Sequence, residues 1–355
     1  MTRFAFILHP IKVADIARKF GIARYLPHRL IEAACARMPA RLISEISGIE
    51  SPTGATTEGW FVGCTLTTRQ FIEGNEERSV AKVIEAAKMA QDLGADIVGL
   101  GAFTAVVGDG GRRVADAVDI AVTTGNSYTV ATAIEGTLKA AEVMEINPGE
   151  ATAAVVGATG SIGRICAHLL ADRVPRIILI GRSRDGLDEL AEELADRDTE
   201  VEVSLSPEES IPQADLVVTV TSALDTVIEP EMLRPGAVVC DVARPRDVSV
   251  RVAHERDDVL VIEGGAVAIP GDVDFHFDFG FPPGTAYACM AETMILALEG
   301  RAEDFSLGKR LSIERVREIA DLGVKHGFGL AGFRSFERAV DDETIKRIKR
   351  NAAAR

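Results

Sequence analysis

The sequence predicts an α/β protein in which a doubly wound parallel sheet is preceded by an N-terminal α/β substrate domain and followed by C-terminal helices. Three observations predict this fold class. Short apolar runs alternate with amphipathic stretches along most of the 355 residues, as in parallel sheets with crossover helices. An apolar run, a glycine turn, a helix and a second apolar run follow one another over Ala153–Arg182. Glycine-rich or polar loops end several of the apolar runs, where such sheets bind ligands.

The domain boundaries are predicted from chain length and from one turn. A chain of this length suits two or three domains, and Asn147-Pro148-Gly149 forms a natural break. We predict an N-terminal α/β domain over 1–148, a nucleotide-binding domain over 149–268, and over 269–355 a C-terminal helical segment with a mobile tail.

The N-terminal domain mixes helical and strand-like patterns. Helical spacing occurs in Val13–Phe20, Leu30–Met38 and Val80–Leu93, and a further helix follows the loop Thr123–Ser127 and runs to about Glu145. Strand-like runs lie within Leu42–Thr65, Ala95–Gly101 and Asp119–Val122.

The second domain continues the alternation. A helix is expected over Arg184–Asp196, and the remaining strands are expected at Val201–Leu205, Asp215–Thr221, Ala237–Val242 and Val259–Glu263. Beyond it, Pro270–Gly284 is irregular, Thr285 is expected to cap a helix that ends at Gly300, and further helices cover Ser312–His326 and part of the tail from Phe333.

The glycine turn has the order that a Rossmann dinucleotide site requires. Gly157 permits the tight turn, Gly160 lets the backbone approach a pyrophosphate, and Gly163 lets the helix pack on the strand. Free N–H groups at the helix start then face the anion. The predicted cofactor-binding residues are Gly157, Thr159, Gly160, Ser161, Ile162, Gly163, Arg182, Arg184, Thr221, Gly264 and Gly265.

The residues after the second strand select the cofactor. An acidic residue there would bind the ribose 2′-hydroxyl of NADH, but this chain has Arg182 and Arg184, whose guanidinium groups suit a 2′-phosphate. NADPH is therefore the expected cofactor. The alternative is that both arginines are solvated charges at a helix start.

A second chemical element lies far along the chain at Cys289, in the first turn of the helix expected after Thr285. Unpaired N–H groups and the helix dipole at such a position lower the pKa of a thiol and favour the nucleophilic thiolate. Glu292 shares its helix face and is a candidate to act on or orient a substrate. The alternatives are that Cys289 is a core residue, that Glu292 makes a structural hydrogen bond, and that Asn126 caps a helix instead of contacting substrate.

Composition narrows the function classes. The net charge of −15 and the 5% aromatic content argue against nucleic acid. The five cysteines lack any CxxC pair, so neither a disulfide framework nor a zinc site is expected and no metal ligands are assigned. No apolar run is long enough to span a bilayer, and we expect a cytoplasmic protein. Against the acidic total, Met1–Arg41 carries eight Lys or Arg and two acidic residues. Such a segment suits an acidic partner or is simply a solvated helix face.

Several motifs together resemble the long-chain acyl-(acyl carrier protein) reductases over roughly Ile46–Phe328. The motifs are GLGAF at Gly99–Phe103, TTGN at Thr123–Asn126, GATGSIG at Gly157–Gly163, Arg182, Gly264-Gly265, ACxAE at Ala288–Glu292 and VKHGF at Val324–Phe328. The chain departs from the family pattern in Met1–Arg41, in the Phe-rich segment Pro270–Pro283 and in the tail after Phe328.

The resemblance implies NADPH-dependent reduction of a long-chain acyl thioester to fatty aldehyde through an acyl-enzyme on Cys289. It also implies acyl carrier protein as donor, docking on the basic N-terminal segment, and an association with Mg²⁺. Donors near Cys289 would stabilise the oxyanion: backbone N–H groups first, then Asn126, Lys325 or His326, the last also a candidate acid. Two alternatives stay open: a cysteine-independent NADP dehydrogenase of the shikimate type, and a non-catalytic protein that binds NADPH or an acyl thioester.

Overall fold

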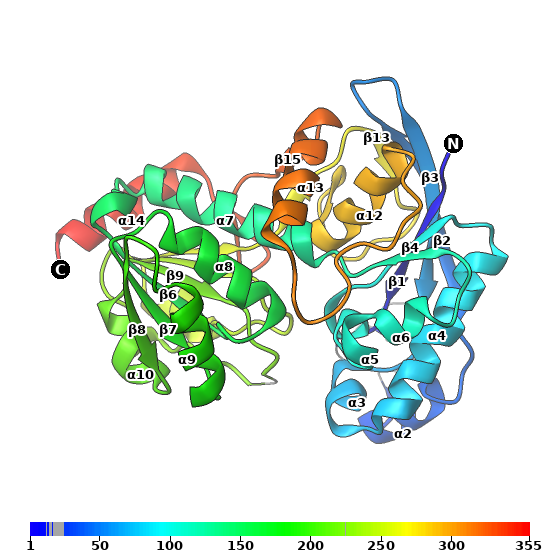
Figure 1. Ribbon diagram of the computed structural model, residues 1–355, viewed down its shortest axis with the longest axis horizontal. Helices are drawn as coiled ribbons and strands as arrows, with labels where there is room; N and C mark the ends of the chain where they lie inside the picture. The colour runs from blue at the N-terminus through cyan, green and yellow to red at the C-terminus, as the bar shows by residue number, and fades with distance from the viewer. Residues whose placement is uncertain (12, 14–15, 17–24, 224) are drawn as a thin grey trace. The chain divides into compact units, whose positions relative to one another are not determined.

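The computed structural model describes residues 1–11, 13, 16, 25–223 and 225–355, and the chain forms two compact units (Figure 1). Unit 1 comprises Met1–Tyr128, Ala268–Arg310 and Glu318–Gly329. Unit 2 comprises Thr129–Val267, Leu311–Arg317 and Leu330–Arg355.

Unit 1 is built on a six-stranded mixed sheet with the order β13-β2-β3-β1-β4-β5. Strands β1, β3, β4 and β5 run parallel, whereas β2 is antiparallel to both of its neighbours. The run Phe4–Leu8, to which no strand was assigned from the sequence, is the central strand, and it is buried on both faces as a covered parallel strand must be. The bounds are β1 Phe4–Leu8, β2 Arg41–Glu50, β3 Thr56–Gly63, β4 Ile97–Gly99, β5 Ala121–Thr123 and β13 Gly271–Asp274.

Helices α4 and α12 both pack on β1 and β3. The predicted apolar face of α4 is confirmed, because Val80, Val83 and Ala87 are buried in one cluster with Ala5 and Ile7 of β1. The helices of this unit are α2 His28–Cys35, α3 Thr68–Glu73, α4 Glu76–Asp92, α5 Val107–Gly110, α6 Arg112–Ala115, α12 Ala288–Leu298 and most of α13 Ile313–Lys325.

Unit 2 contains the predicted doubly wound parallel sheet, with the order β11-β10-β9-β6-β7-β8. The strand order reverses between β6 and β9, where ligands bind in such sheets. Figure 1 shows β6 to β9 side by side, with α8 and α9 beside them. The strands are β6 Thr152–Val156, β7 Arg176–Ile180, β8 Glu200–Ser204, β9 Leu216–Thr219, β10 Val238–Asp241 and β11 Leu260–Glu263.

Among the described residues, the remaining elements are six α-helices, of which α7 has 18 residues, and five short strands. The helices are α7 Asn126–Val143, α8 Ser161–Ala171, α9 Arg184–Glu193, α10 Pro207–Ser210, α11 Val250–Glu255 and α14 Asp342–Ala353. A three-stranded sheet joins β12 Ala266–Ala268, β14 Thr285–Tyr287 and β15 Gly329–Leu330, and β16 Arg334–Ser335 pairs with β17 Arg338–Ala339.

Two expectations about the C-terminal region differ from the structure. Thr285 does not cap α12; it lies in β14, its Oγ1 donates to the Pro282 carbonyl oxygen at 2.6 Å, and Tyr287 is the N-cap residue. Nor does 269–355 form one separate segment, since α12 belongs to unit 1 and α14 to unit 2. The reason is that α12 is mostly apolar and all of its residues but Cys289 are buried, so it must be enclosed by other elements.

The helix expected at Val13–Phe20 lies mostly outside the described residues. In the part of the chain that is described, no helix is both long and apolar enough to cross a bilayer.

Candidate functional site

Cys289 is the accessible residue of an otherwise enclosed helix. All other residues of α12, from Ala288 to Leu298, are buried, whereas Cys289 is half-buried. It occupies the second position of the helix, and no side chain caps that helix start. A helix start without a side-chain cap is a favourable place for an anionic group.

Two glycines let the start of α12 approach the carboxyl ends of the parallel strands. A Cβ on Gly125, after β5, would lie 2.3 Å from both Cα and Cβ of Cys289, and Gly125 has a φ of +74°. A Cβ on Gly101, after β4, would lie 3.2 Å from Cys289 Sγ. Side chains at these positions would displace the cysteine, so GLGAF and TTGN line its surroundings because they supply glycine.

Glu292, one turn further along α12, is completely buried. Its carboxylate accepts a hydrogen bond from the Tyr128 backbone N–H at 2.7 Å and another from the Thr123 hydroxyl. Tyr128 is the third residue of α7, so this carboxylate caps α7 from a different helix. Burial raises the pKa of Glu292, and these hydrogen bonds act in the opposite direction. The contacts describe a residue that positions the loop Thr123–Asn126 beside Cys289.

Asn126 is the first residue of α7 and is half-buried. The neighbouring N–H groups of the helix start are bound by other residues: Ser127 N–H donates to Ser306 Oγ at 3.2 Å, and Tyr128 N–H donates to Glu292. These bonds provide the capping for which Asn126 was a candidate. Asn126 directly follows Gly125 and so lies in the loop that borders Cys289.

His326 lies at the other end of α12. Its Nδ1 is 3.0 Å from Ser51 Oγ, and its Nε2 is 2.7 Å from the carboxylate of Glu299. Lys325 binds the same carboxylate at 2.6 Å. Glu299 follows the C-terminus of α12 and Cys289 stands near its start, which separates them by about 15 Å at 1.5 Å per residue. The structure therefore does not bring His326 or Lys325 to Cys289. Both residues instead link the C-terminal end of α13 to the C-terminal end of α12 through Glu299.

In unit 2 the glycine turn follows β6 as predicted. Gly157 has a φ of +84°, and a Cβ on Gly163 would lie 2.2 Å from the Gly157 carbonyl oxygen, so helix α8 packs directly on the turn. Gly160 is exposed, and the N-terminus of α8 has no side-chain cap. The uncapped N–H groups that include Ser161 and Ile162 fit a dinucleotide pyrophosphate.

The two candidate arginines after β7 differ in their contacts. Arg184 pairs with Asp188 one turn along α9, at 3.0 Å. Arg182 is exposed, and among the described residues no carboxylate forms an ion pair with it. Thr159 lies beside this loop, since a Cβ on Gly186 would meet its methyl group at 3.1 Å. Arg182 is thus better placed than Arg184 to receive an external phosphate.

Thr221 lies in the loop after β9, which touches the glycine turn: a Cβ on Gly157 would be 2.7 Å from the Val220 carbonyl oxygen. A fully buried carboxylate holds this loop. Asp247 accepts hydrogen bonds from Thr221 N–H at 2.9 Å, Thr221 Oγ1 at 2.5 Å and Thr219 Oγ1 at 2.6 Å.

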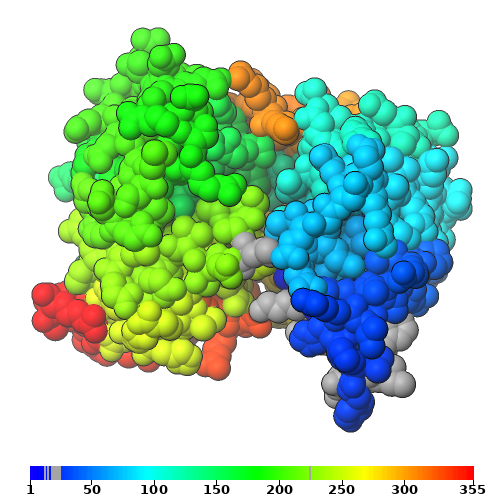
Figure 2. Space-filling model, turned by 90° about the horizontal axis from the view of Figure 1, so that it is seen from below, coloured from blue at the N-terminus to red at the C-terminus, as the bar shows by residue number. Residues whose placement is uncertain are grey.

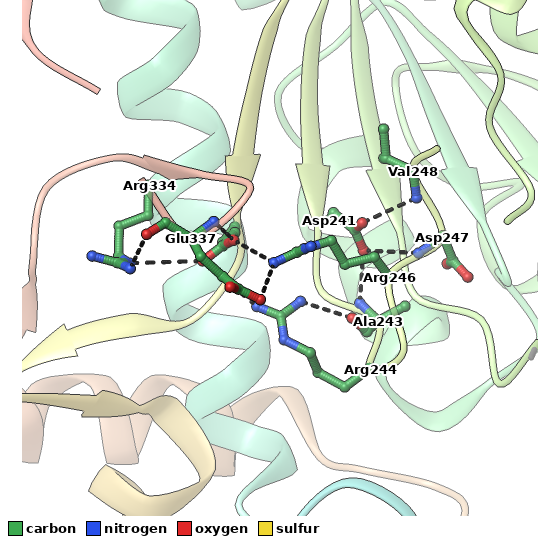
Figure 3. A network of polar contacts seen from close by, with 9 residues as sticks. Asp241, Ala243, Arg244, Arg246, Asp247, Val248, Arg334 and Glu337 are labelled. Atoms are coloured by element: carbon green, nitrogen blue, oxygen red, sulfur yellow. Dashed lines mark hydrogen bonds and ion pairs between the residues drawn. The ribbon is translucent and has the colours of Figure 1, made fainter. Parts of the chain in front are cut away.

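Asp247 and Asp241 were not identified from the sequence. Asp241 ends β10 and accepts hydrogen bonds from the N–H groups of Ala243 and Val248 (Figure 3). Burial raises the pKa of Asp241 to about 6. The sequence carries no local signal for them, because a buried carboxylate is distinguished by the N–H and hydroxyl groups that it binds.

Gly264 and Gly265 follow β11. A Cβ on Gly264 would lie 2.7 Å from the Val242 side chain, and Gly265 has a φ of +84°. The carboxylate of the preceding residue, Glu263, accepts hydrogen bonds from the Arg246 guanidinium at 3.2 Å and from the Glu337 backbone N–H at 2.6 Å. Figure 3 shows Arg246 and Arg334 gathered around this position.

A basic pocket of about 480 Å³ lies between α2, α3 and the start of α4. Figure 2 shows the surface formed by these blue and light-blue residues. Its charged lining has four arginines and two acidic residues, namely Arg29, Arg37, Arg69, Arg78, Glu32 and Glu73. Arg69 pairs with Glu32, while Arg29 is exposed. Several other basic residues of the N-terminal segment, including Lys12 and Arg18, lie outside the described residues.

Among the described residues, no group of three or more His, Cys, Asp or Glu side chains is arranged to hold a metal ion. None of the five cysteines, all of them described, forms a disulfide.

Comparison with known proteins gives one family model and several relatives. Residues 138–263 match the model Shikimate / quinate 5-dehydrogenase. The chain is 34% identical over 307 residues to the aminotransferase PigE of a Serratia species; the match covers 85% of this chain but 36% of that protein. It is 31% identical over 329 residues to the long-chain acyl-[acyl-carrier-protein] reductase of Synechococcus elongatus, covering 88% of this chain and 94% of that protein.

The solved structure of shikimate 5-dehydrogenase from Listeria monocytogenes aligns with a TM-score of 0.38 and 11% identity, over 90% of this chain and 96% of that one.

Proposed function

Because the chain belongs to the family of the long-chain acyl-[acyl-carrier-protein] reductase, we propose that it reduces a long-chain acyl thioester to a fatty aldehyde with NADPH, through a thioester on Cys289. The broader assignment, an NAD(P)-dependent oxidoreductase with a Rossmann domain, stands on the family matches and the sheet order of unit 2.

One observation carries the proposal: Cys289 alone is accessible on an otherwise buried helix, at its uncapped N-terminus and beside the strand ends. In the first step the Cys289 thiolate attacks the acyl carbonyl carbon and forms a C–S bond. The C–S bond to the carrier then breaks, and the carrier thiolate leaves and takes up a proton.

The start of α12 stabilises the oxyanion that precedes this cleavage. Its backbone N–H groups have no side-chain cap, and donors fixed before reaction need no reorganisation. Asn126 is a further candidate donor because it follows Gly125, which packs on Cys289. Glu292 acts on the reaction by positioning this loop, and His326 by holding the far end of α12.

When bound, NADPH supplies the hydride that converts the enzyme thioester to a thiohemiacetal, which collapses to aldehyde and regenerates the thiol. Unit 2 contributes the binding groups. The uncapped N–H groups of α8 suit the pyrophosphate, and Arg182 suits the 2′-phosphate. Thr221, held by Asp247, borders the glycine turn.

The carrier is proposed to be an acidic acyl carrier protein that docks on the basic pocket between α2, α3 and α4. Its four arginines outnumber its two acidic residues within a chain whose total charge is −15. Such complementarity steers an acidic partner without requiring a large apolar interface. The Mg²⁺ that the family resemblance implies has no assigned ligands in this proposal.

The direct test is a trapping experiment. The protein is incubated with acyl carrier protein and coenzyme A thioesters, and the acyl-enzyme is identified by mass spectrometry without NADPH. Aldehyde is measured after NADPH is added. We expect an acyl adduct on Cys289 and aldehyde release, with both lost in Cys289→Ser. Cys35→Ser is the matched control, because Cys35 is half-buried in unit 1 but lies in α2.

Each alternative function has its own outcome. Normal reduction by Cys289→Ser would favour a dehydrogenase of the shikimate type, to which the family match over 138–263 points. NADPH binding without turnover of any thioester would favour a non-catalytic protein.

A further inference from the structure

Aromatic residues alternate along the connection between β13 and β14. Phenylalanine occupies 275, 277, 279 and 281, while the intervening His276, Asp278 and Gly280 are exposed. Phe275 is buried, and the three later rings are half-buried. The segment is not a regular strand, because His276 has a φ of +48° and Gly280 a φ of +95°, so its turns rather than strand alternation bring the rings together. The half-buried rings therefore offer apolar surface that the fold does not fully enclose.

The rings form one continuous series. Phe61 of β3 stacks on Phe275 with centroids 5.5 Å apart and meets Phe279 edge-on at the same distance. Phe277 also contacts Phe61, at 6.5 Å. Phe279 stacks on Phe281 at 5.8 Å. Five of the 14 phenylalanines in the chain thus gather in unit 1.

The series ends beside the reactive cysteine. Phe281 contacts Tyr287, with ring centroids 4.3 Å apart. Tyr287 is the N-cap residue of α12, two positions before Cys289. A line of aromatic contacts therefore runs from β3 of the sheet to the start of the helix on which the acyl group is proposed to be carried.

We propose that the half-buried rings of this aromatic series, Phe277, Phe279, Phe281 and Tyr287, backed by the buried Phe61 and Phe275, form the binding surface for the acyl chain of the thioester. The inference rests on the function proposed above. A thioester on Cys289 fixes the carbonyl end of the chain, so the methylene groups must lie along residues that adjoin the start of α12. Aromatic rings without charged members suit an unbranched hydrocarbon, whose transfer from water is favourable.

The order of the rings predicts a graded effect of chain length. Phe281 adjoins Tyr287 and would contact the methylenes nearest the thioester, whereas Phe277 contacts Phe61 at the opposite end of the series. Loss of the Phe281 ring should lower kcat/KM for acyl thioesters of every chain length. Loss of the Phe277 ring should lower kcat/KM only for the longest acyl chains, by about fourfold per methylene that loses its contact.

The experiment compares kcat/KM for short, medium and long saturated acyl coenzyme A thioesters. The variants are Phe277→Ala and Phe281→Ala, with Phe277→Leu and Phe281→Leu to keep apolar bulk where alanine impairs folding. His276→Asn is the matched control, because His276 is exposed in the same segment and its φ of +48° is one that asparagine tolerates. The His276→Asn control should keep the wild-type chain-length profile. Every variant should keep the wild-type KM for NADPH.

A chain-length profile that stays parallel to wild type in all four Phe variants would overturn the inference. So would variants that alter only self-association or binding to lipid vesicles, because the rings would then serve a second copy of the chain or a membrane. If wild type forms no aldehyde, the proposed function fails by itself. Binding of long-chain acyl coenzyme A to Cys289→Ala, with and without Phe277→Ala, then tests the aromatic surface separately.

Discussion

At the scale of single residues, Glu292 shows how position separates a structural carboxylate from a catalytic one. It stands one turn from Cys289, yet it is fully buried and its oxygens face Thr123 and Tyr128. A carboxylate enclosed by such donors stabilises a helix start, and we expect it to position the loop rather than to exchange protons with a substrate. Cys289, on the same helix, is the side chain that the fold leaves accessible.

The effect of a substitution at Glu292 should therefore depend on whether the new side chain can still accept hydrogen bonds. Glu292→Gln keeps an oxygen for the Tyr128 N–H, and Thr123 can rotate its hydroxyl to accept from the new amide, so activity and its pH profile should stay close to wild type. Glu292→Ala leaves those donors unpaired and should lower the free energy of unfolding by about 1–3 kcal/mol. Stopped assays across pH and thermal unfolding make the comparison. A glutamine variant as inactive as Cys289→Ser would instead indicate acid–base catalysis.

At the scale of elements, the two nucleotide-facing helices start differently. Ser183 caps α9 through the Gly186 N–H at 3.2 Å, whereas α8 begins without a side-chain cap. If NADPH binds as proposed, the loop before α9 contributes side chains and the loop before α8 contributes backbone N–H groups. The first loop would then select for the 2′-phosphate, and the second would bind the pyrophosphate.

The β7–α9 loop should accordingly decide cofactor preference through Arg182. Arg182→Ala removes a charge-assisted contact, which is commonly worth 1.5–3 kcal/mol, and should raise the Kd for NADPH by about tenfold to a hundredfold. Binding of NADH should change little. Arg184→Ala is the matched control, since Arg184 already pairs with Asp188. Titration of cofactor fluorescence measures the affinities of wild type and both variants for NADPH and NADH, and equal losses for both cofactors in Arg182→Ala would contradict the assignment.

The elements also show where sequence reasoning succeeds and where it stops. Helix α4 was placed correctly because its pattern is local, and it begins earlier than expected because Asn75 accepts the Arg78 N–H at 3.0 Å and so caps the first turn. Helix α12 begins later than expected because Thr285–Tyr287 is drawn into a strand by β12, a partner distant in the sequence.

At the scale of the whole molecule, the parallel sheet and glycine turn of unit 2 were predictable because each depends on neighbouring residues. The surroundings of Cys289 were not, since Gly101 and Gly125 reach it from loops more than a hundred residues away. Asp247 escaped notice because a buried carboxylate is recognised only through the groups it binds. The Phe-rich segment read as irregular for the same reason: its ring contacts are made in three dimensions.

The uneven charge of the molecule allows a test of the proposed docking of acyl carrier protein on the basic pocket. If an acidic protein docks on the basic pocket, kcat/KM with acyl carrier protein thioesters should fall roughly tenfold as salt shortens the range of the attraction. Arg29→Ala should weaken this donor and leave activity with acyl coenzyme A near wild type. Arg347→Ala, an exposed change in α14 of unit 2, is the control. A salt response identical for both donors, unaffected by Arg29→Ala, would rule out docking at the pocket.

The different burial of the five cysteines allows Cys289 to be titrated with a thiol reagent. Burial raises the pKa of the Cys64 thiol to about 11 and that of Cys240 to about 12, and Cys166 is shifted in the same direction. An alkylating reagent at neutral pH therefore discriminates among the five thiols, sparing these three and reaching Cys289. With Cys35 replaced, a folded molecule should take up one equivalent of reagent, and any uptake beyond one equivalent reports molecules in which the buried thiols have become accessible.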